Sequence, residues 1–218
     1  MNIIAINGSP RKKGNTSTLL KKALEGAKAV GAKVELINLY DLNFKGCISC
    51  FACKRVNSKS VGKCAMKDGL TDVLNKIIEC DVLILGSPIY LGNVTGEMKS
   101  FMERLLFMNL SYDGGHSSNF NGKISTAFIY TMNVPESIMI EKGYENVFKS
   151  NDKYLQLLNG PSEYLISNDT YQFDDYSKYN ASDFDENHKS YIKKTQFLID
   201  CQKAFKLGVR LSNDFSNK

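Results

Sequence analysis

The chain has 218 residues, a length that predicts one large domain with at most an added subdomain. Hydrophobic residues make up 43% of the sequence and charged residues 23%, which excludes a disordered or fibrous chain. Lysine and arginine number 28 against 23 aspartates and glutamates, and the resulting net charge of +5 is too small and too scattered to indicate a nucleic-acid-binding protein.

Short apolar runs alternate with stretches of helical periodicity along most of the chain. Runs rich in β-branched and aliphatic residues predict strands at residues 2–7, 34–39, 81–85, 123–130 and 163–167. Apolar side chains at three- and four-residue spacing predict helices at residues 16–30, 71–78, about 96–108, within 137–158 and about 190–211. This alternation predicts an α/β fold, in which a doubly wound parallel sheet has helices on both faces.

The sequence predicts no membrane segment and no exported form. No apolar run approaches the roughly 18 residues that a membrane-spanning helix needs. The first ten residues, MNIIAINGSP, lack a basic start and soon reach turn-forming residues, unlike a secretory signal peptide. We therefore expect a cytoplasmic protein, in which the six cysteines are thiols or metal ligands rather than disulfides.

One segment does not follow this alternation. Residues 168–190 contain six acidic side chains and several aromatic ones, with little periodicity. A solvated surface loop explains this composition. A flap over a ligand, or a contact between subunits, explains it as well. We interpret the segment as an acidic aromatic insertion.

The loop after the first predicted strand, GSPRKKGNTS at residues 8–17, has the features of a phosphate site. It leads directly into a helix, whose free N-terminal amides and dipole attract an anion. Several of its side chains can donate hydrogen bonds or supply positive charge: Ser9, Arg11, Asn15, Thr16 and Ser17. The dinucleotide pattern GxGxxG and the Walker pattern are both absent, so the loop suits a single phosphate monoester. A plain strand–helix loop, with Asn15 or Thr16 as the helix cap, is the alternative.

A second loop, residues 87–99, follows the third predicted strand at the same edge of the sheet. Its sequence, SPIYLGNVTGEMK, combines a proline, two glycines, a tyrosine and an asparagine. Such a segment can present backbone amides and carbonyls to the edge of a planar ring. The alternative is an ordinary strand–helix loop in which Tyr90 packs on the core.

Three separated motifs, GSPRKKGNTS, GCISCFAC and SPIYLGNVTGEMKSFMER, occur in the chain. Together they resemble the NADPH-dependent FMN reductase and iron–sulfur flavoprotein branch of the flavodoxin-like superfamily, over about the first 130 residues. The resemblance implies a five-stranded flavodoxin-like sheet of order 2-1-3-4-5 in a three-layer α/β/α arrangement. It also implies non-covalently bound FMN and a homodimer or homotetramer.

The resemblance assigns site residues to both loops. The FMN phosphate would be held by Ser9, Arg11, Asn15, Thr16 and Ser17. The isoalloxazine ring would be contacted by Pro88, Ile89, Tyr90, Leu91, Gly92 and Asn93. Thr131 is a further expected FMN-binding residue, with no particular part of the cofactor assigned to it. The sequence departs from the family after the fourth predicted strand, where residues 131–135, TMNVP, replace the glycine-rich turn of many relatives.

Four closely spaced cysteines occur in a predicted cysteine-bearing loop at about residues 43–67: Cys47, Cys50, Cys53 and Cys64. Four thiolates at this spacing can ligate a [4Fe–4S] cluster or a zinc ion. The resemblance favours iron, although the ten residues between Cys53 and Cys64 form a longer gap than in most iron–sulfur flavoproteins. Free thiols without a metal are the third interpretation.

The resemblance implies one FMN-binding domain over residues 1–218 and an oxidoreductase. FMN would pass electrons from NAD(P)H to a small acceptor such as a quinone or a flavin, and no side chain is assigned a catalytic role. One alternative is an iron–sulfur flavoprotein that relays electrons between a ferredoxin-like donor, a cluster and FMN. The other is a flavodoxin-like redox-sensing module without turnover. We expect neither nucleic acid nor a membrane as a partner.

Overall fold

The structure, a computed structural model, describes residues 1–56, 62–114 and 117–216. Five parallel strands form the central sheet: β1 (Asn2–Asn7), β2 (Lys33–Asn38), β3 (Val82–Tyr90), β5 (Ile124–Thr131) and β6 (Asn159–Ser167). Their order across the sheet is β2-β1-β3-β5-β6, which confirms the predicted order 2-1-3-4-5. A further strand, β4 (Asn93–Val94), pairs antiparallel with the end of β3 and is not among the predicted elements.

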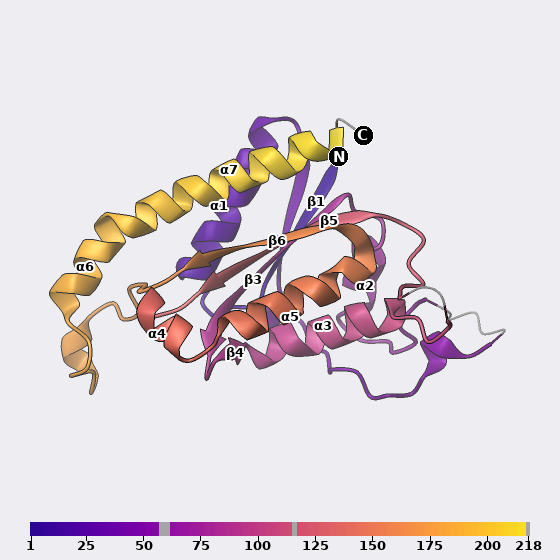
Figure 1. Ribbon diagram of the computed structural model, residues 1–218, viewed down its shortest axis with the longest axis horizontal. Helices are drawn as coiled ribbons and strands as arrows, with labels where there is room; N and C mark the ends of the chain where they lie inside the picture. The colour runs from indigo at the N-terminus through magenta and orange to yellow at the C-terminus, as the bar shows by residue number, and fades with distance from the viewer. Residues whose placement is uncertain (57–61, 115–116, 217–218) are drawn as a thin grey trace.

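Helices cover both faces of the sheet, as Figure 1 shows. One face carries α1 (Asn15–Ala29) and α7 (Gln196–Ser216), which pack against each other. The opposite face carries α2 (Thr71–Ile77), α3 (Gly96–Asn109) and α5 (Glu145–Leu155). The predicted three-layer α/β/α fold is therefore confirmed. The remaining helical elements are shorter: α4 (Glu136–Glu141), α6 (Glu186–Lys194) and the 3-10 turns Leu39–Asp41, Ala52–Lys54, Gln156–Leu158 and Tyr176–Lys178.

The two helical layers produce two hydrophobic cores, one on each face of the sheet. Alternate residues of β1 contribute to each of them. Ile3 and Ala5 belong to the core with α1 and α7, whereas Ile4 and Ile6 belong to the core with α3. A strand that is buried on both faces needs apolar residues in succession. This requirement explains why residues 2–7 have almost no polar alternation.

The C-terminal third departs from the predicted boundaries. The predicted helix within 137–158 is two helices, α4 and α5, because Gly143 adopts a left-handed φ of 67° after α4. The predicted helix at 190–211 is also two, α6 and α7, because the backbone of Thr195 is not helical. β6 begins at Asn159, earlier than predicted. Across the described residues, no helix is long and apolar enough to cross a membrane.

Candidate functional site

The carboxyl ends of β1 and β3 hold the two predicted loops together. The amide of Gly8 donates to the carbonyl of Gly86 over 2.8 Å. The hydroxyl of Thr95, the N-cap residue of α3, donates to the carbonyl of Gly8 over 2.7 Å. Thr95 also accepts a hydrogen bond from the amide of Met98. Thr95 therefore connects the loop after β1 to the helix after β3. It is not among the predicted site residues, although a threonine before a helix is a recognisable capping signal.

The first loop, residues 8–17, leaves the N-terminus of α1 open. Gly14 occupies the N-cap position, and no side chain in the described part of the chain caps this helix. The amides of the first turn lack partners within the helix, so they are available to a ligand. Ser9 shapes the loop, because its hydroxyl accepts a hydrogen bond from the amide of Arg11 over 3.1 Å. The loop therefore has the arrangement of an anion site at a helix N-terminus.

Predicted phosphate ligands occupy the first turn of α1. Ser17 is 1% exposed, and its Oγ has no hydrogen-bond partner among the described residues. The hydroxyl of Thr16 is buried and lies 2.7 Å from the hydroxyl of Thr131, at the end of β5. Gly14 is the N-cap residue, so neither Asn15 nor Thr16 caps the helix as the plain-loop alternative expects. An unpartnered buried hydroxyl beside free amides is what a phosphate oxygen would complete.

The second predicted loop is partly a hairpin rather than a loop. β3 continues as far as Tyr90 and pairs with β4, and the chain reverses at Leu91 and Gly92. Both reversal residues have positive φ, 50° and 80° respectively. The tip of this hairpin is exposed, since Leu91 has no buried surface and Tyr90 is 46% exposed. The alternative for this segment requires Tyr90 to pack on the core, and its exposure shows that it does not.

The structure brings the remaining predicted flavin residues to the same edge of the sheet. Pro88 lies opposite Thr131 in the register of β3 and β5. Because Thr131 in turn contacts Thr16, the end of β5 connects the first loop to the base of the hairpin. The predicted ring contacts all belong to this hairpin: Pro88, Ile89, Tyr90, Leu91, Gly92 and Asn93. Thr131, the other predicted FMN-binding residue, ends β5.

The acidic aromatic insertion, residues 168–190, lies against the first loop. We call its residues 169–179 the strap. Arg11 Nη1 donates to the carbonyl of Gln172 over 2.6 Å. Asn15 Nδ2 donates to the carbonyl of Tyr171 over 2.9 Å. Two predicted phosphate-binding side chains therefore contact the strap, so this part of the insertion is packed on the candidate site.

A charged cluster anchors the start of the strap. Asp169 accepts hydrogen bonds from Lys189, which is 4% exposed, and from Nε2 of His188. Lys189 also donates to the carbonyl of Asn133, in the loop after β5. Burial raises the pKa of the Asp169 carboxyl, but the hydrogen bonds from Lys189 and His188 outweigh it, so the pKa lies below its ordinary value. Sequence reasoning missed this cluster, because no local pattern pairs residues 19 and 20 positions apart in a loop.

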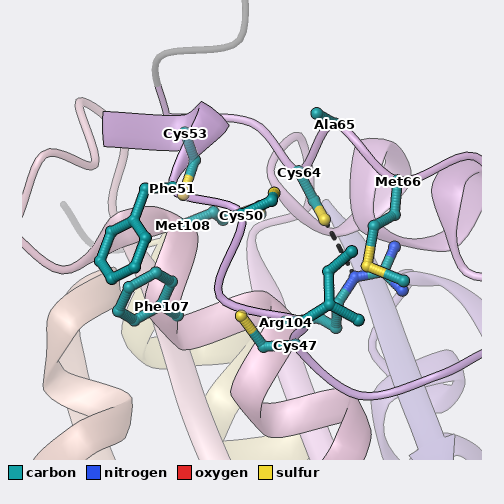
Figure 2. Close-up of a pocket in the computed structure, with 11 residues that line it drawn as sticks. Cys47, Cys50, Phe51, Cys53, Cys64, Ala65, Met66, Arg104, Phe107 and Met108 are labelled. Atoms are coloured by element: carbon teal, nitrogen blue, oxygen red, sulfur yellow. Dashed lines mark hydrogen bonds between the residues drawn. The ribbon is translucent and has the colours of Figure 1, made fainter. Parts of the chain in front are cut away.

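The four predicted metal ligands line one pocket, shown in Figure 2. Cys53 is buried, Cys50 is exposed, and Cys47 and Cys64 are half-buried. Burial raises the pKa of the Cys53 thiol. The chemistry of the four thiols fits a [4Fe–4S] cluster. Their arrangement does not fit it, since the cavity holds only about 20 Å³ and no three metal-binding side chains of the described residues are placed to hold a metal ion.

Arg104 of α3 closes this pocket on one side. Its guanidinium is 1% exposed and donates to Cys64 Sγ over 2.9 Å. It also forms an ion pair with Asp68 over 2.8 Å and donates to the carbonyl of Lys45 over 2.9 Å. Burial raises the pKa of the Asp68 carboxyl, but the hydrogen bonds from Arg104 outweigh it, so the pKa is lowered overall. Arg104 therefore fixes both ends of the cysteine loop to α3, a role that the sequence pattern does not indicate.

Comparisons with known proteins identify the same family that the three sequence motifs resemble. The family model of the NADPH-dependent FMN reductases matches residues 1–152. An iron–sulfur flavoprotein of Methanocaldococcus jannaschii is 40% identical over 104 residues, 48% of this chain and 51% of the relative. An iron–sulfur flavoprotein of Archaeoglobus fulgidus is 32% identical over 148 residues, 67% of this chain and 61% of the relative. The matched part thus spans about half to three fifths of these relatives' length.

Solved structures share the fold over nearly the whole chain. An azoreductase from Bacillus anthracis has a TM-score of 0.67 at 12% identity and covers 96% of this chain and 99% of its own. An NAD(P)H:quinone oxidoreductase from Methanothermobacter marburgensis has a TM-score of 0.66 at 15% identity, with 97% and 96% covered. An archaeal flavodoxin reaches 0.51 at 12% identity and covers 99% of both chains. At these identities the likeness establishes the flavodoxin-like fold alone.

We predict that Asp169→Asn lowers the free energy of unfolding by about 3 kcal/mol at pH 7, because it leaves the buried ammonium of Lys189 without its counter-ion. Since the folded pKa of Asp169 is depressed, its stabilisation is fully present above the unfolded pKa of about 4 and is lost as pH falls through the folded pKa. Urea unfolding across this range should therefore show the two proteins converging in acid.

The matched control for this prediction is Asp174→Asn, which removes an exposed carboxylate from the same insertion. We expect it to change the free energy of unfolding by less than about 0.5 kcal/mol at every pH. A difference between wild type and Asp169→Asn that stays constant down to pH 3 would contradict the assignment of the ion pair.

Proposed function

We propose that this chain, which belongs to the NADPH-dependent FMN reductase family, binds FMN at the carboxyl edge of the sheet and reduces a small acceptor, such as a quinone or a flavin, with electrons from NAD(P)H. When bound, FMN supplies the redox chemistry, since it accepts hydride from a nicotinamide and passes electrons onward. The chain supplies binding and orientation. The observation that carries the proposal is the open N-terminus of α1 beside the unpartnered hydroxyl of Ser17.

The first loop fits the phosphate of FMN in its chemistry. A buried hydroxyl without a partner costs roughly 1–3 kcal/mol, and a phosphate oxygen that accepts from Ser17 would remove this cost. The free amides and the dipole of α1 favour the same negative charge. Arg11 adds a guanidinium at the edge of the loop. Ser9, Asn15 and Thr16 complete the proposed phosphate site.

The hairpin and the end of β5 fit the isoalloxazine ring. On this proposal, backbone groups of residues 88–93 contact the edge of the ring, and Thr131 contacts it from β5. The two positive φ angles at Leu91 and Gly92 form the reversal that places the hairpin tip at this edge of the sheet. The half-exposed ring of Tyr90 then lies beside the flavin, where a planar acceptor can stack.

The proposal covers residues 1–218 as one domain, because α7 packs on α1 and β6 pairs with β5. All six cysteines are free thiols, which suits the cytoplasm. The exposed apolar tip of the hairpin suits a contact between subunits, as in a homodimer or homotetramer.

We predict that Ser17→Ala weakens FMN binding by about tenfold or more, because it removes a hydrogen bond to a charged phosphate. The same change should not lower the stability of the flavin-free protein, since the hydroxyl has no partner among the residues described. Both quantities can be measured on one sample, by quenching of flavin fluorescence and by urea unfolding.

The matched control is Ser162→Ala on β6, which removes another buried and unpartnered hydroxyl, one outside the proposed site. FMN affinity should be unchanged in this variant. An unchanged FMN affinity in Ser17→Ala as well would contradict the phosphate assignment.

We predict that anaerobic addition of NADPH or NADH bleaches the visible band of the FMN-loaded protein, because hydride transfer reduces the flavin. The band should recover when a quinone is added. This measurement separates an oxidoreductase from a redox-sensing module without turnover. If the visible band of the bound flavin persists with both NADPH and NADH, the result would favour the redox-sensing module without turnover.

A second candidate function is an iron–sulfur flavoprotein, in which a [4Fe–4S] cluster and FMN relay electrons from a ferredoxin-like donor. Two observations favour it. The four clustered cysteines line one pocket, and relatives that match this chain are named iron–sulfur flavoproteins. The small cavity and the arrangement of the thiols count against it.

Metal analysis tests this candidate directly. If it is correct, anaerobically purified protein will contain about four iron and four sulfide ions per chain. Cys64→Ser should then lose most of the iron, whereas Cys201→Ser, which changes a thiol of α7 outside the pocket, should retain it. Protein with flavin but little iron would leave the cysteines as thiols and the reductase as the remaining function.

A further inference from the structure

We propose that the strap, residues 169–179, determines which flavin the site accepts: it closes the phosphate end, so that FMN is bound and FAD is excluded. This inference rests on the proposed function, because it concerns the same phosphate loop. The strap lies outside residues 1–152, the part of the chain that the family model matches.

The strap contacts the phosphate loop through two backbone carbonyls. Arg11 Nη1 and Asn15 Nδ2, which come from the loop and the first turn of α1, donate to the carbonyls of Gln172 and Tyr171. FMN ends at its phosphate, whereas FAD continues from the same phosphate through a second phosphate to adenosine. Because the strap is fastened to residues on both sides of the N-cap Gly14, this extension would meet the strap directly beside the loop.

Aromatic packing and a hydrogen bond within the strap hold its backbone in place. Tyr176 is 6% exposed, and its hydroxyl accepts a hydrogen bond from the amide of Gln172 over 3.1 Å. Its ring packs edge-on against Tyr171 and Phe173, each with ring centroids 5.1 Å apart. Phe173 also stacks on Tyr179 at 4.2 Å. These four rings make a small core within the strap itself.

The start of the strap is tied to the loop after β5. The amides of Asp169 and Thr170 donate to the carbonyls of Val134 and Met132, both over 3.0 Å. The ion pair with Lys189 holds the Asp169 side chain. To admit a bulky group at the phosphate, the strap would have to break backbone hydrogen bonds, an ion pair and ring contacts together, whereas FMN requires none of this.

The experiment compares FMN and FAD binding to flavin-free protein by quenching of flavin fluorescence. Wild type should bind FMN about a hundredfold more tightly than FAD, and Tyr176→Ala should narrow this ratio by about tenfold, mainly through tighter FAD binding. The matched control is Tyr154→Ala, which removes an exposed tyrosine of α5 and should leave the ratio unchanged. Circular dichroism checks the fold of each variant.

If Tyr176→Ala does not fold, Phe173→Ala can replace it, because this change removes ring contacts with Tyr176 and Tyr179. The same narrowing of the ratio of FMN to FAD affinity is expected. The proposal would be overturned if a folded strap variant kept the wild-type ratio of FMN to FAD affinity. Equal weakening of FMN binding and FAD binding in the variant leaves that ratio unchanged and would overturn it as well. Equal binding of FMN and FAD by wild type would also overturn it. Wild type that binds neither flavin would contradict the proposed function itself, which separates the two failures.

Discussion

The open N-terminus of α1 is the constraint on which the proposed function depends. β1 is buried on both faces and ends at the carboxyl edge of the sheet. The loop that follows leads to Gly14, the N-cap residue of α1, and no side chain among the described residues caps this helix. Free amides and the unpartnered hydroxyl of Ser17 therefore point to a ligand rather than to a self-contained loop. Other contacts fix this turn in place: Thr95 holds Gly8 from α3, and Thr131 holds Thr16 from β5.

Helix α3 links the two parts of the molecule that carry chemistry. Its N-cap, Thr95, is tied to the phosphate loop, and Arg104 in its second half closes the cysteine pocket. Thr95 and Arg104 are nine positions apart, a span of about 14 Å along the helix axis. Cys53 and Cys64 therefore lie on the α3 face of the sheet, away from its carboxyl edge. An electron path between them would follow α3 only if the cysteines hold a redox centre.

Sequence reasoning was most successful where one local pattern decides the structure. The apolar run at residues 2–7 and the turn at residues 8–17 predicted β1 and the start of α1, because a strand buried on both faces and an anion loop each have a short signature. It failed where residues far apart meet. The contact between Arg11 and Gln172 joins positions 161 residues apart, and the one between Thr16 and Thr131 joins positions 115 apart. Neither periodicity nor spacing reports such contacts.

Binding of the FMN phosphate at the N-terminus of α1 can be measured by calorimetric titration of the flavin-free protein with FMN and with riboflavin. Riboflavin has the same ring and lacks the phosphate. We expect one FMN to bind per chain, and riboflavin to bind about a hundredfold or more weakly, because it lacks several charge-assisted hydrogen bonds to the phosphate. Equal affinity for the two flavins would mean that the loop after β1 has no part in binding, and the phosphate assignment would then be wrong.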